Sequence, residues 1–205
     1  MNARQQFDEL GTLMFSEKEL PLTREEWQQI ENLLDEVEYE HIVGGDAGEG
    51  HSVKVCRFYN DVDRPTALHQ RSEEISNIVM SNKMKLFYKR IMGTDQLCLR
   101  RCQANLLHKD DYIGMHVDQD SNPDYFATVV FHFDSAYRGG EFITRDHQLG
   151  DHRYKPEKRT VLINDCSIPH EVSSVELGER KTLACFISKK FTDSTHHRKK
   201  FQVLK

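Results

Sequence analysis

The sequence predicts a mostly β protein with helices in its N-terminal part. In the first 95 residues apolar side chains recur at helical spacing, which favours helices and connections. From residue 97 the pattern changes to short strands separated by turns with Gly, Asp, Asn or Pro. Such strands are typical of an antiparallel sandwich or barrel, including jelly rolls and cupins. One domain spanning residues 1–205 is expected, because neither a repeat nor a linker divides the chain.

Three helices are predicted in the N-terminal part, residues 1–95. The first follows a capping-box sequence that runs from Thr23 to Glu26. The second begins near Ser72, and the third ends at Gly93. The glycine-rich segment 44–50 is predicted to be a surface connection, with a lid over a site as the alternative.

The β core is expected over residues 97–191, with a basic tail at 192–205. Strands are predicted at residues 97–108, 125–133, 140–145, 152–155, 160–164, 170–175 and 181–188. On the first of these, alternation places Arg101, Gln103 and Asn105 on one face. That polar face is expected either to contact a substrate or to face the solvent.

Composition and charge exclude several classes of protein. No apolar stretch approaches the roughly 18 residues that a membrane helix needs, and the N-terminus lacks the apolar region of a secretory signal. A formal net charge of −5 gives no basic surface for nucleic acid. Five cysteines without a C-x-x-C pair are typical of reduced thiols. We therefore expect a cytoplasmic protein whose partners include neither nucleic acid nor a membrane.

Three H-x-D pairs are candidate metal ligands: His108/Asp110, His116/Asp118 and His132/Asp134. Ferrous oxygenases hold iron with two imidazoles and one carboxylate, and residues i and i+2 of a strand share a face. Chance alone gives about one such pair in a chain of this composition, so the motif carries little weight by itself. Four predicted strands separate Asp118 from His170, as a double-stranded β-helix requires. The pair His132/Asp134 leaves only three strands, and the pair His108/Asp110 leaves four but lies at a charged strand end where a solvated turn explains it. The count and the position together favour His116 with Asp118.

Arg180 lies ten residues after His170 and opens the last predicted strand. A guanidinium can grip one carboxylate of a diacid in bidentate fashion while the other end chelates a metal. Thr182 and Ala184 are expected to face inward with Arg180, where small side chains leave room for a cosubstrate. The alternative is that Arg180 is one charge in an exposed turn.

These motifs resemble the prolyl 4-hydroxylase-like branch of the iron(II)/2-oxoglutarate dioxygenases, and PKHD-type hydroxylases in particular. The resemblance covers about residues 97–191 and is carried by residues 115–118, 137–142 and 169–180. It implies a double-stranded β-helix core and assigns these roles: His116, Asp118 and His170 as catalytic iron ligands, Arg180 as the 2-oxoglutarate anchor, and His132 as a cosubstrate contact in place of a family tyrosine.

The resemblance also implies an enzyme that uses Fe(II), 2-oxoglutarate and O2, with ascorbate as a candidate further cofactor. Such an enzyme would hydroxylate a peptide or a free amino acid, prolyl side chains first, and release succinate and CO2. A natural-product or other small-molecule hydroxylase is the nearest alternative. A non-catalytic cupin-like metal-binding domain is a second alternative, and a zinc hydrolase would leave Arg180 unexplained.

Overall fold

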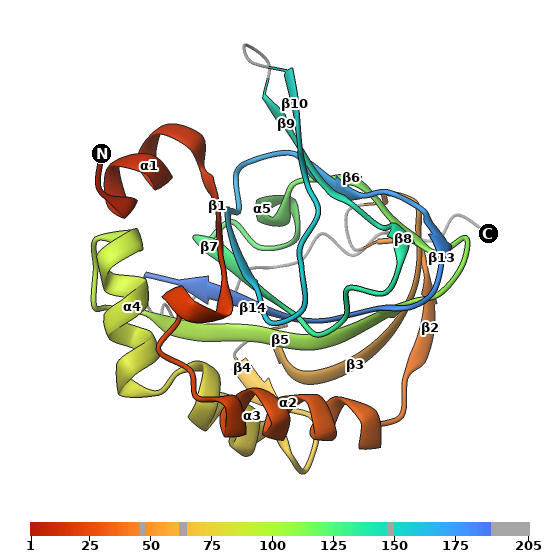
Figure 1. Cartoon of the computed structure of the whole chain (residues 1–205), viewed down its shortest axis with the longest axis horizontal. Coiled ribbons are helices and arrows are strands. Elements are labelled where there is room, and N and C mark those ends of the chain that lie inside the picture. Colours follow the sequence, from red (N-terminus) through yellow and green to blue (C-terminus); the bar gives the residue numbers. More distant parts are fainter. Residues whose placement is uncertain (46–47, 62–64, 147–149, 190–205) are drawn as a thin grey trace, which may run out of the picture.

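The main feature of the structure is a strongly curled antiparallel sheet (Figure 1). The computed structural model describes residues 1–45, 48–61, 65–146 and 150–189, and the predicted basic tail at 192–205 lies outside the described residues. Its α-helices are α1 (Ala3–Leu10), α2 (Arg24–Glu36), α3 (Ser72–Val79), α4 (Asn82–Met92) and α5 (Asp118–Ser121). Its strands are β1 (Thr12–Phe15), β2 (Glu40–Val43), β3 (His51–Asp61), β4 (Pro65–Ala67), β5 (Cys98–Leu107), β6 (Tyr112–His116), β7 (Ala127–His132), β8 (Arg138–Gly139), β9 (Phe142–Asp146), β10 (Gly150–Tyr154), β11 (Val161–Asp165), β12 (His170–Val172), β13 (Val175–Leu177) and β14 (Arg180–Ser188).

The strands of the main sheet follow the order β1-β11-β7-β14-β5-β3-β6-β12-β9-β10. β2 and β4 pair with β3 beside this path, and β8 and β13 form a separate two-stranded ladder. One part of β3 pairs with β5 and another with β6, so β3 joins the two halves of the rolled sheet. The predicted fold class, mostly β with N-terminal helices and a double-stranded β-helix core, is confirmed.

Side chains on the central strands alternate between two environments. On β14, Leu183 and Ile187 are buried on the outer face, where they join the larger apolar core. Thr182, Ala184 and Phe186 point to the inside of the roll and line a cavity there. This period of two is a property of extended backbone, and it separates a structural face from a face that is available for chemistry.

Helices α2, α3 and α4 cover the outer face of the sheet (Figure 1). Trp27 of α2 is fully buried, and its ring meets Phe131 and Phe133 edge-on at centroid distances of 5.8 and 5.6 Å. The predicted capping box begins α2, with Thr23 and Glu26 exchanging backbone-to-side-chain hydrogen bonds. The three predicted helices are confirmed, whereas α1 was missed.

The prediction of helices and connections for residues 1–95 was wrong at β1, β2, β3 and β4. β3 is 11 residues long and lies inside the main sheet. Val53 and Val55 are buried on either side of the partly exposed Lys54, which is the period-two signal of a strand. Two smaller differences concern β6, which was not predicted, and the predicted strand 170–175, which is divided between β12 and β13.

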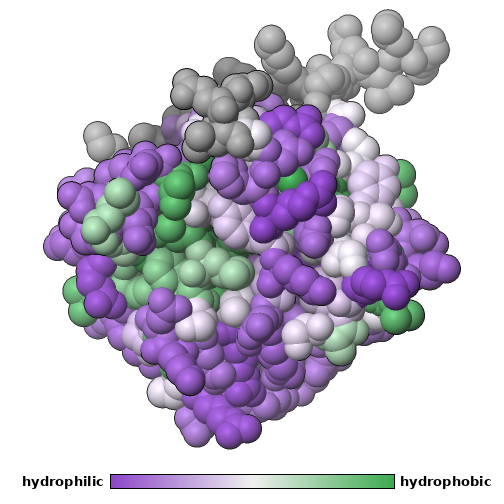
Figure 2. Space-filling view, turned by 45° about the horizontal axis from the view of Figure 1, so that its top comes forward, coloured by the Kyte–Doolittle hydropathy of each residue, from purple (hydrophilic) through white to green (hydrophobic). Residues whose placement is uncertain are grey.

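Polar and charged side chains cover most of the face shown in Figure 2, and an apolar hollow lies on the left of that view. The large exposed apolar side chains among the described residues are spread over several elements, including α1, β1, β2, α4 and β13. All five cysteines are free thiols, and four of them are buried. No helix in the described part of the chain combines the length and apolar character needed to cross a membrane.

Candidate active site

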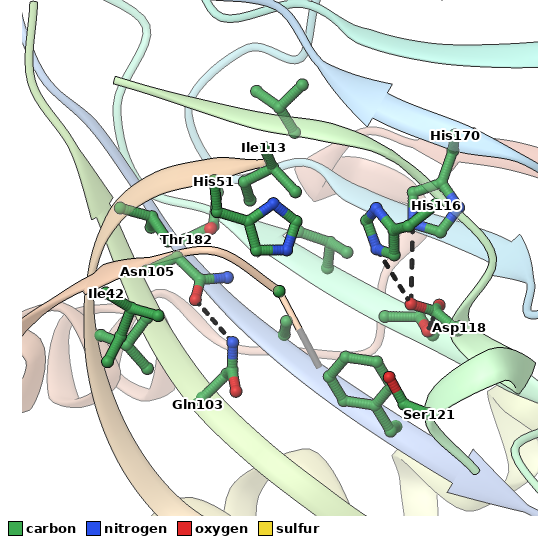
Figure 3. Close-up of a pocket in the computed structure, with 18 of the residues that line it drawn as sticks. Ile42, His51, Gln103, Asn105, Ile113, His116, Asp118, Ser121, His170 and Thr182 are labelled. Atoms are coloured by element: carbon green, nitrogen blue, oxygen red, sulfur yellow. Dashed lines mark hydrogen bonds and ion pairs between the residues drawn. The ribbon is translucent and has the colours of Figure 1, made fainter. Parts of the chain in front are cut away.

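Three residues singled out in the sequence converge on one end of the cavity inside the roll. His116 ends β6 and His170 begins β12, and the two are directly paired across these antiparallel strands. The Nε2 atoms of His116 and His170 lie 3.4 and 3.7 Å from Oδ1 of Asp118. Figure 3 shows both rings and the carboxylate gathered on one side of the cavity. Two imidazole nitrogens and one carboxylate oxygen are the ligand set that ferrous iron takes in oxygenases.

A β-bulge aims His116 into the cavity. Between the pairs His170–His116 and Val172–Ile113 the register shifts, so that β6 has one extra residue relative to β12. Bulges re-aim side chains next to active sites, and this one lets both Ile113 and His116 line the cavity. Asp118 is the first residue of α5 and not part of a strand. The argument that the two residues of an H-x-D pair share one face of a strand therefore does not apply here, although the two side chains do converge.

Both histidines are held with Nε2 facing the carboxylate. Nδ1 of His116 lies 2.8 Å from the Gly114 carbonyl oxygen, and Nδ1 of His170 lies 2.9 Å from the Ile168 carbonyl oxygen. A carbonyl oxygen only accepts, so in each ring Nδ1–H donates and the Nε2 lone pair remains for a metal. The ring of Phe142 stacks on His170 at a centroid distance of 5.1 Å, which fixes the plane of that imidazole.

Asp118 is 3% exposed and is held at both carboxylate oxygens. The hydroxyl of Thr128 donates to Oδ2 at 2.5 Å, while Oδ1 faces the two imidazoles. Burial by itself raises the pKa of Asp118, but His170, His116 and Thr128 lower it more, to about 2. Asp118 is therefore ionised at neutral pH and has one oxygen directed at the candidate metal position.

The two imidazoles respond differently to the same carboxylate. Burial lowers the pKa of His116, but the hydrogen bond and the charge of Asp118 outweigh it, so the net shift is upward. For His170, burial has the larger effect, and the positive charge of His116 adds to it, so the pKa falls below its ordinary value. A lowered pKa favours the neutral imidazole that a metal requires.

Arg180 lies at the opposite end of the cavity and is 2% exposed, so the alternative of an exposed turn was wrong. At this end, the buried polar atoms that have no hydrogen-bond partner among the described residues include Nε of Arg180, Oγ1 of Thr182 and the hydroxyl of Tyr137. Burial lowers the pKa of Arg180, and the nearby Tyr137 opposes that effect. Buried polar groups without partners are costly, so these atoms fit a carboxylate that would bind between them.

His132 lies beside Arg180 and behind the cavity wall. It is paired with Thr182 across β7 and β14 and faces inward, yet it is not among the residues that line the cavity. Its Nε2 lies 3.3 Å from Nη2 of Arg180, and because a guanidinium only donates, Nε2 accepts. Burial and the charge of Arg180 lower the pKa of His132 well below its ordinary value. The structure thus brings His132 into contact with Arg180 rather than with the cavity.

The glycines of the segment 137–142 make room for the groups around them. Gly140 has φ +63°, and a Cβ added there would lie 3.0 Å from Cδ of Arg180. At Gly139 an added Cβ would lie 2.2 Å from the Ser174 carbonyl oxygen, closer than real contacts allow. These positions therefore require glycine, which explains why the segment stands out in the sequence.

Several residues of the cavity were missed by the sequence analysis. Thr128 and the pair Glu49–His51 belong to no motif, and His51 approaches His116 with a ring-centroid distance of 5.5 Å. Nε2 of His51 lies 3.0 Å from Oε1 of Glu49. Gly44 and Gly45 also line the cavity. The described residues of segment 44–50 form a connection, as predicted, with Gly48 and Gly50 exposed, but Gly44, Gly45 and Glu49 also border the cavity; residues 46–47 lie outside the described residues.

The two other H-x-D pairs do not contribute to the cavity. His108 lies at a turn beside Glu179 and Asp111, with Nε2 3.2 Å from the Glu179 carboxylate, and Asp110 has the positive φ of a turn residue. Neither these residues nor Asp134 line the cavity. Among the described residues, only the groups His116–Asp118–His170 and Glu49–His51–His116 bring three potential metal ligands together, and they share His116.

Comparisons with known proteins agree with this geometry. The family model described as the 2OG-Fe(II) oxygenase superfamily matches residues 102–188. A solved oxidoreductase of the 2OG-Fe(II) oxygenase family from Burkholderia pseudomallei is 33% identical, over 91% of this chain and 89% of that one, with a TM-score of 0.83. No match was found among curated proteins.

More distant solved structures share the fold. A prolyl hydroxylase from Trichoplax adhaerens, in complex with a peptide fragment of the hypoxia inducible factor oxygen degradation domain, is 15% identical over 91% of this chain and 87% of that one, with a TM-score of 0.65. The epimerase SnoN, in complex with Fe3+, alpha ketoglutarate and nogalamycin RO, is 11% identical over 91% and 82%, with a TM-score of 0.68. At these identities the likeness concerns the fold alone.

Proposed function

The chain belongs to the 2OG-Fe(II) oxygenase superfamily, and on that premise we propose that it hydroxylates an amino-acid side chain, with a prolyl-type side chain as the first candidate. Enzymes of this family use Fe(II), 2-oxoglutarate and O2. Iron would be held by His116, Asp118 and His170, and the far carboxylate of 2-oxoglutarate by Arg180. A purely non-catalytic cupin-like domain is disfavoured by membership of this enzyme family.

The observation that carries the proposal is the arrangement of two complementary ends in one cavity. At one end, two Nε2 atoms face an ionised carboxylate oxygen. At the other end, a buried guanidinium nitrogen and the hydroxyl of Thr182 have no partner among the described residues. A diacid that chelates a metal with one end and presents a carboxylate with the other fits both ends at once.

The bound iron, with 2-oxoglutarate and O2, would supply the oxidising chemistry that inserts one oxygen atom into a substrate C–H bond and the other into succinate, with release of CO2. The chain orients the metal ligands and lines the cavity with apolar side chains. Thr128 orients the Asp118 carboxylate, and the Gly114 and Ile168 carbonyl oxygens orient the imidazoles. Val130 and Phe142 are among the apolar side chains that keep water from the cavity.

The substrate proposal draws on the prolyl hydroxylases among the solved structures, one of which is described with a peptide bound. A small-molecule substrate is the second candidate, and the epimerase SnoN, described with nogalamycin RO bound, supports it. Both kinds of neighbour share the fold of this chain at comparable TM-scores. The choice between them depends on the groups that line the substrate side of the cavity.

Anaerobic addition of Fe(II) and 2-oxoglutarate to the purified protein tests the proposed function. We expect the weak visible charge-transfer band of a metal–2-oxoglutarate chelate, followed by slow succinate release when O2 is admitted. The variant Asp118→Gly should lose succinate release, because a carboxylate ligand is removed. Properly folded wild-type protein with neither band nor succinate would refute the proposal, as would unchanged turnover in Asp118→Gly. Omitting ascorbate from the same assay tests whether it acts as a further cofactor.

A further inference from the structure

The substrate side of the cavity is recognisable from the strand register. Starting from Arg180, the inward positions of β14 are Thr182, Ala184 and Phe186, and Phe186 pairs with Thr128 of β7. Thr128 holds the Asp118 carboxylate. Six residues of extended strand span roughly 20 Å at ~3.3 Å each, so Arg180 and Phe186 mark opposite ends of the cavity. A cosubstrate between Arg180 and the metal ligands leaves the Phe186 end for the substrate.

Two guanidinium groups line that end. On β5 the inward positions Arg101 and Gln103 pair with Phe186 and Ala184 of β14. Arg57 of β3 pairs with Gln103, and both arginines line the cavity. Gln103 therefore lies between two cationic side chains. This cationic wall, which consists of Arg57, Gln103 and Arg101, belongs to the same sheet as Arg180 but lies at the other end of the cavity, away from the cosubstrate.

Arg101 is held in one orientation. It is 9% exposed, its Nε donates to Oε1 of Gln103 at 2.8 Å, and its Cζ lies 5.3 Å from the centroid of the Phe186 ring. Nε2 of Gln103 in turn donates to Oδ1 of Asn105 at 2.8 Å, a bond visible in Figure 3. This chain of hydrogen bonds directs the side chains along the cavity wall, and a fixed guanidinium needs little ordering when it binds an anion.

Arg57 is weakly compensated. Its Nη1 lies 3.9 Å from the carboxylate of Glu40, whose side chain is 76% exposed. Exposed ion pairs at that distance contribute little, so Arg57 can exchange Glu40 for an incoming anion at small cost. A carboxylate matches the planar donors of a guanidinium and accepts from the amide of Gln103 as well.

Resting on the proposed function, we infer that the substrate presents a carboxylate to Arg57, Gln103 and Arg101, as a free amino acid or another small carboxylic acid does. The internal prolyl residue of a peptide presents only uncharged amides there. A small acid anchored at this end would place its reactive carbon toward the metal ligands, with 2-oxoglutarate on the Arg180 side. Of the two substrate candidates above, this wall favours the small molecule, with a free amino acid as its first form.

Matched pairs of compounds test the inference on the wild-type protein. Each free L-amino acid is compared with its carboxamide and with an N-acetylated peptide that carries the same residue internally, by succinate release above the uncoupled rate. We expect at least one free acid to stimulate release, and its carboxamide and peptide to be at least tenfold weaker. Stimulation by a carboxamide or peptide equal to that by the acid would overturn the inference, as would a panel in which no acid stimulates release or binds.

Variants of Arg101 and Arg57 test whether the preference for a free acid depends on the cationic wall. Arg101→Gln and Arg57→Gln should each raise the KM for the stimulating acid tenfold or more, while the KM for the cosubstrate stays within twofold. The control Arg153→Gln removes an exposed arginine outside the cavity and should change neither value. An unchanged KM for the acid in both wall variants would refute the assignment.

Calorimetry on the metal-free protein separates this inference from the proposed function. If the acid binds and Arg101→Gln abolishes binding, the anion site stands even when the chelate band and succinate release both fail. If band and succinate appear but acid and carboxamide bind equally, the oxygenase function stands and the carboxylate site is refuted.

Discussion

Replacement of Thr128 by valine should weaken iron binding by 10- to 100-fold. Valine keeps the shape of threonine but lacks the hydroxyl that donates to Oδ2 of Asp118 at 2.5 Å. Without that donor, the carboxylate is no longer forced to present Oδ1 to His116 and His170. Loss of such a partner of a metal ligand costs about 10- to 100-fold in affinity, or ~1.4–2.7 kcal/mol. A hydrogen bond to a charged group contributes about 1.5–3 kcal/mol, which agrees with that range.

The assay is an anaerobic titration with Fe(II) at saturating 2-oxoglutarate, followed by the visible band. Thr160→Val is the matched control, because Thr160 is also a buried threonine but donates to the Glu157 carbonyl oxygen, away from the ligands. We expect a weaker Fe(II) affinity in Thr128→Val alone. Thermal unfolding curves verify that both variants are folded. A Thr128→Val protein that binds Fe(II) within twofold of wild type would show that the hydroxyl does not position Asp118.

Three further predictions concern the Arg180 end of the cavity. Arg180→Lys should raise the concentration of 2-oxoglutarate needed for half-maximal rate by about 10- to 100-fold, because an ammonium cannot make the bidentate contact of a guanidinium. If that concentration is unchanged, Arg180 is not the anchor of the cosubstrate. His132→Phe deprives Nη2 of Arg180 of its acceptor, so the melting temperature should fall by about 3–12 °C, while Fe(II) affinity in the band titration stays unchanged. A melting temperature equal to that of wild type would mean that the contact contributes nothing. Gly140→Ala imposes a side chain at φ +63°, with Cβ 3.0 Å from Arg180, and should cost about 1–2 kcal/mol in urea unfolding and raise the cosubstrate requirement as well. Wild-type values for both would contradict the glycine requirement.

Local patterns were sufficient for the elements whose signals lie within a few residues. The capping box at Thr23 and the alternating strands after residue 97 are such signals, and they correspond to α2 and to most of the β core. Counting strands disfavoured the H-x-D pair at His132, because that count reflects topology, and the charged position of the pair at His108 then left His116 with Asp118. His170 is indeed paired with His116 in the sheet.

Features that depend on distant partners were not predictable in this way. β3 is stabilised by β5 and β6, which come more than 35 residues later, so its short alternation alone did not distinguish it from the helices and connections predicted for residues 1–95. The bulge that turns His116 inward is set by the register of β12, and Asp118 depends on Thr128 from the next strand. A threonine in an apolar strand has no distinctive signal before the strands are assembled.

The environment of the polar face of β5 depends on how the sheet closes. Sequence alternation placed Arg101, Gln103 and Asn105 on one side but could not say whether that side faced solvent or a cavity. Closure of the roll decides this, because β3 and β14 flank β5 and bend the face inward.

Because His116 and His170 are paired across two strands, metal binding depends on the fraction of molecules in which β12 is docked in the sheet. β12 has only three residues, and it must be docked between β6 and β9 before the two imidazoles stand side by side. Any fraction of molecules in which this short strand is detached cannot bind iron, and the apparent dissociation constant rises by the inverse of the docked fraction. Conversely, a bound ion would cross-link neighbouring strands and suppress their opening. Amide hydrogen exchange in β12 would therefore report how completely the protein is loaded.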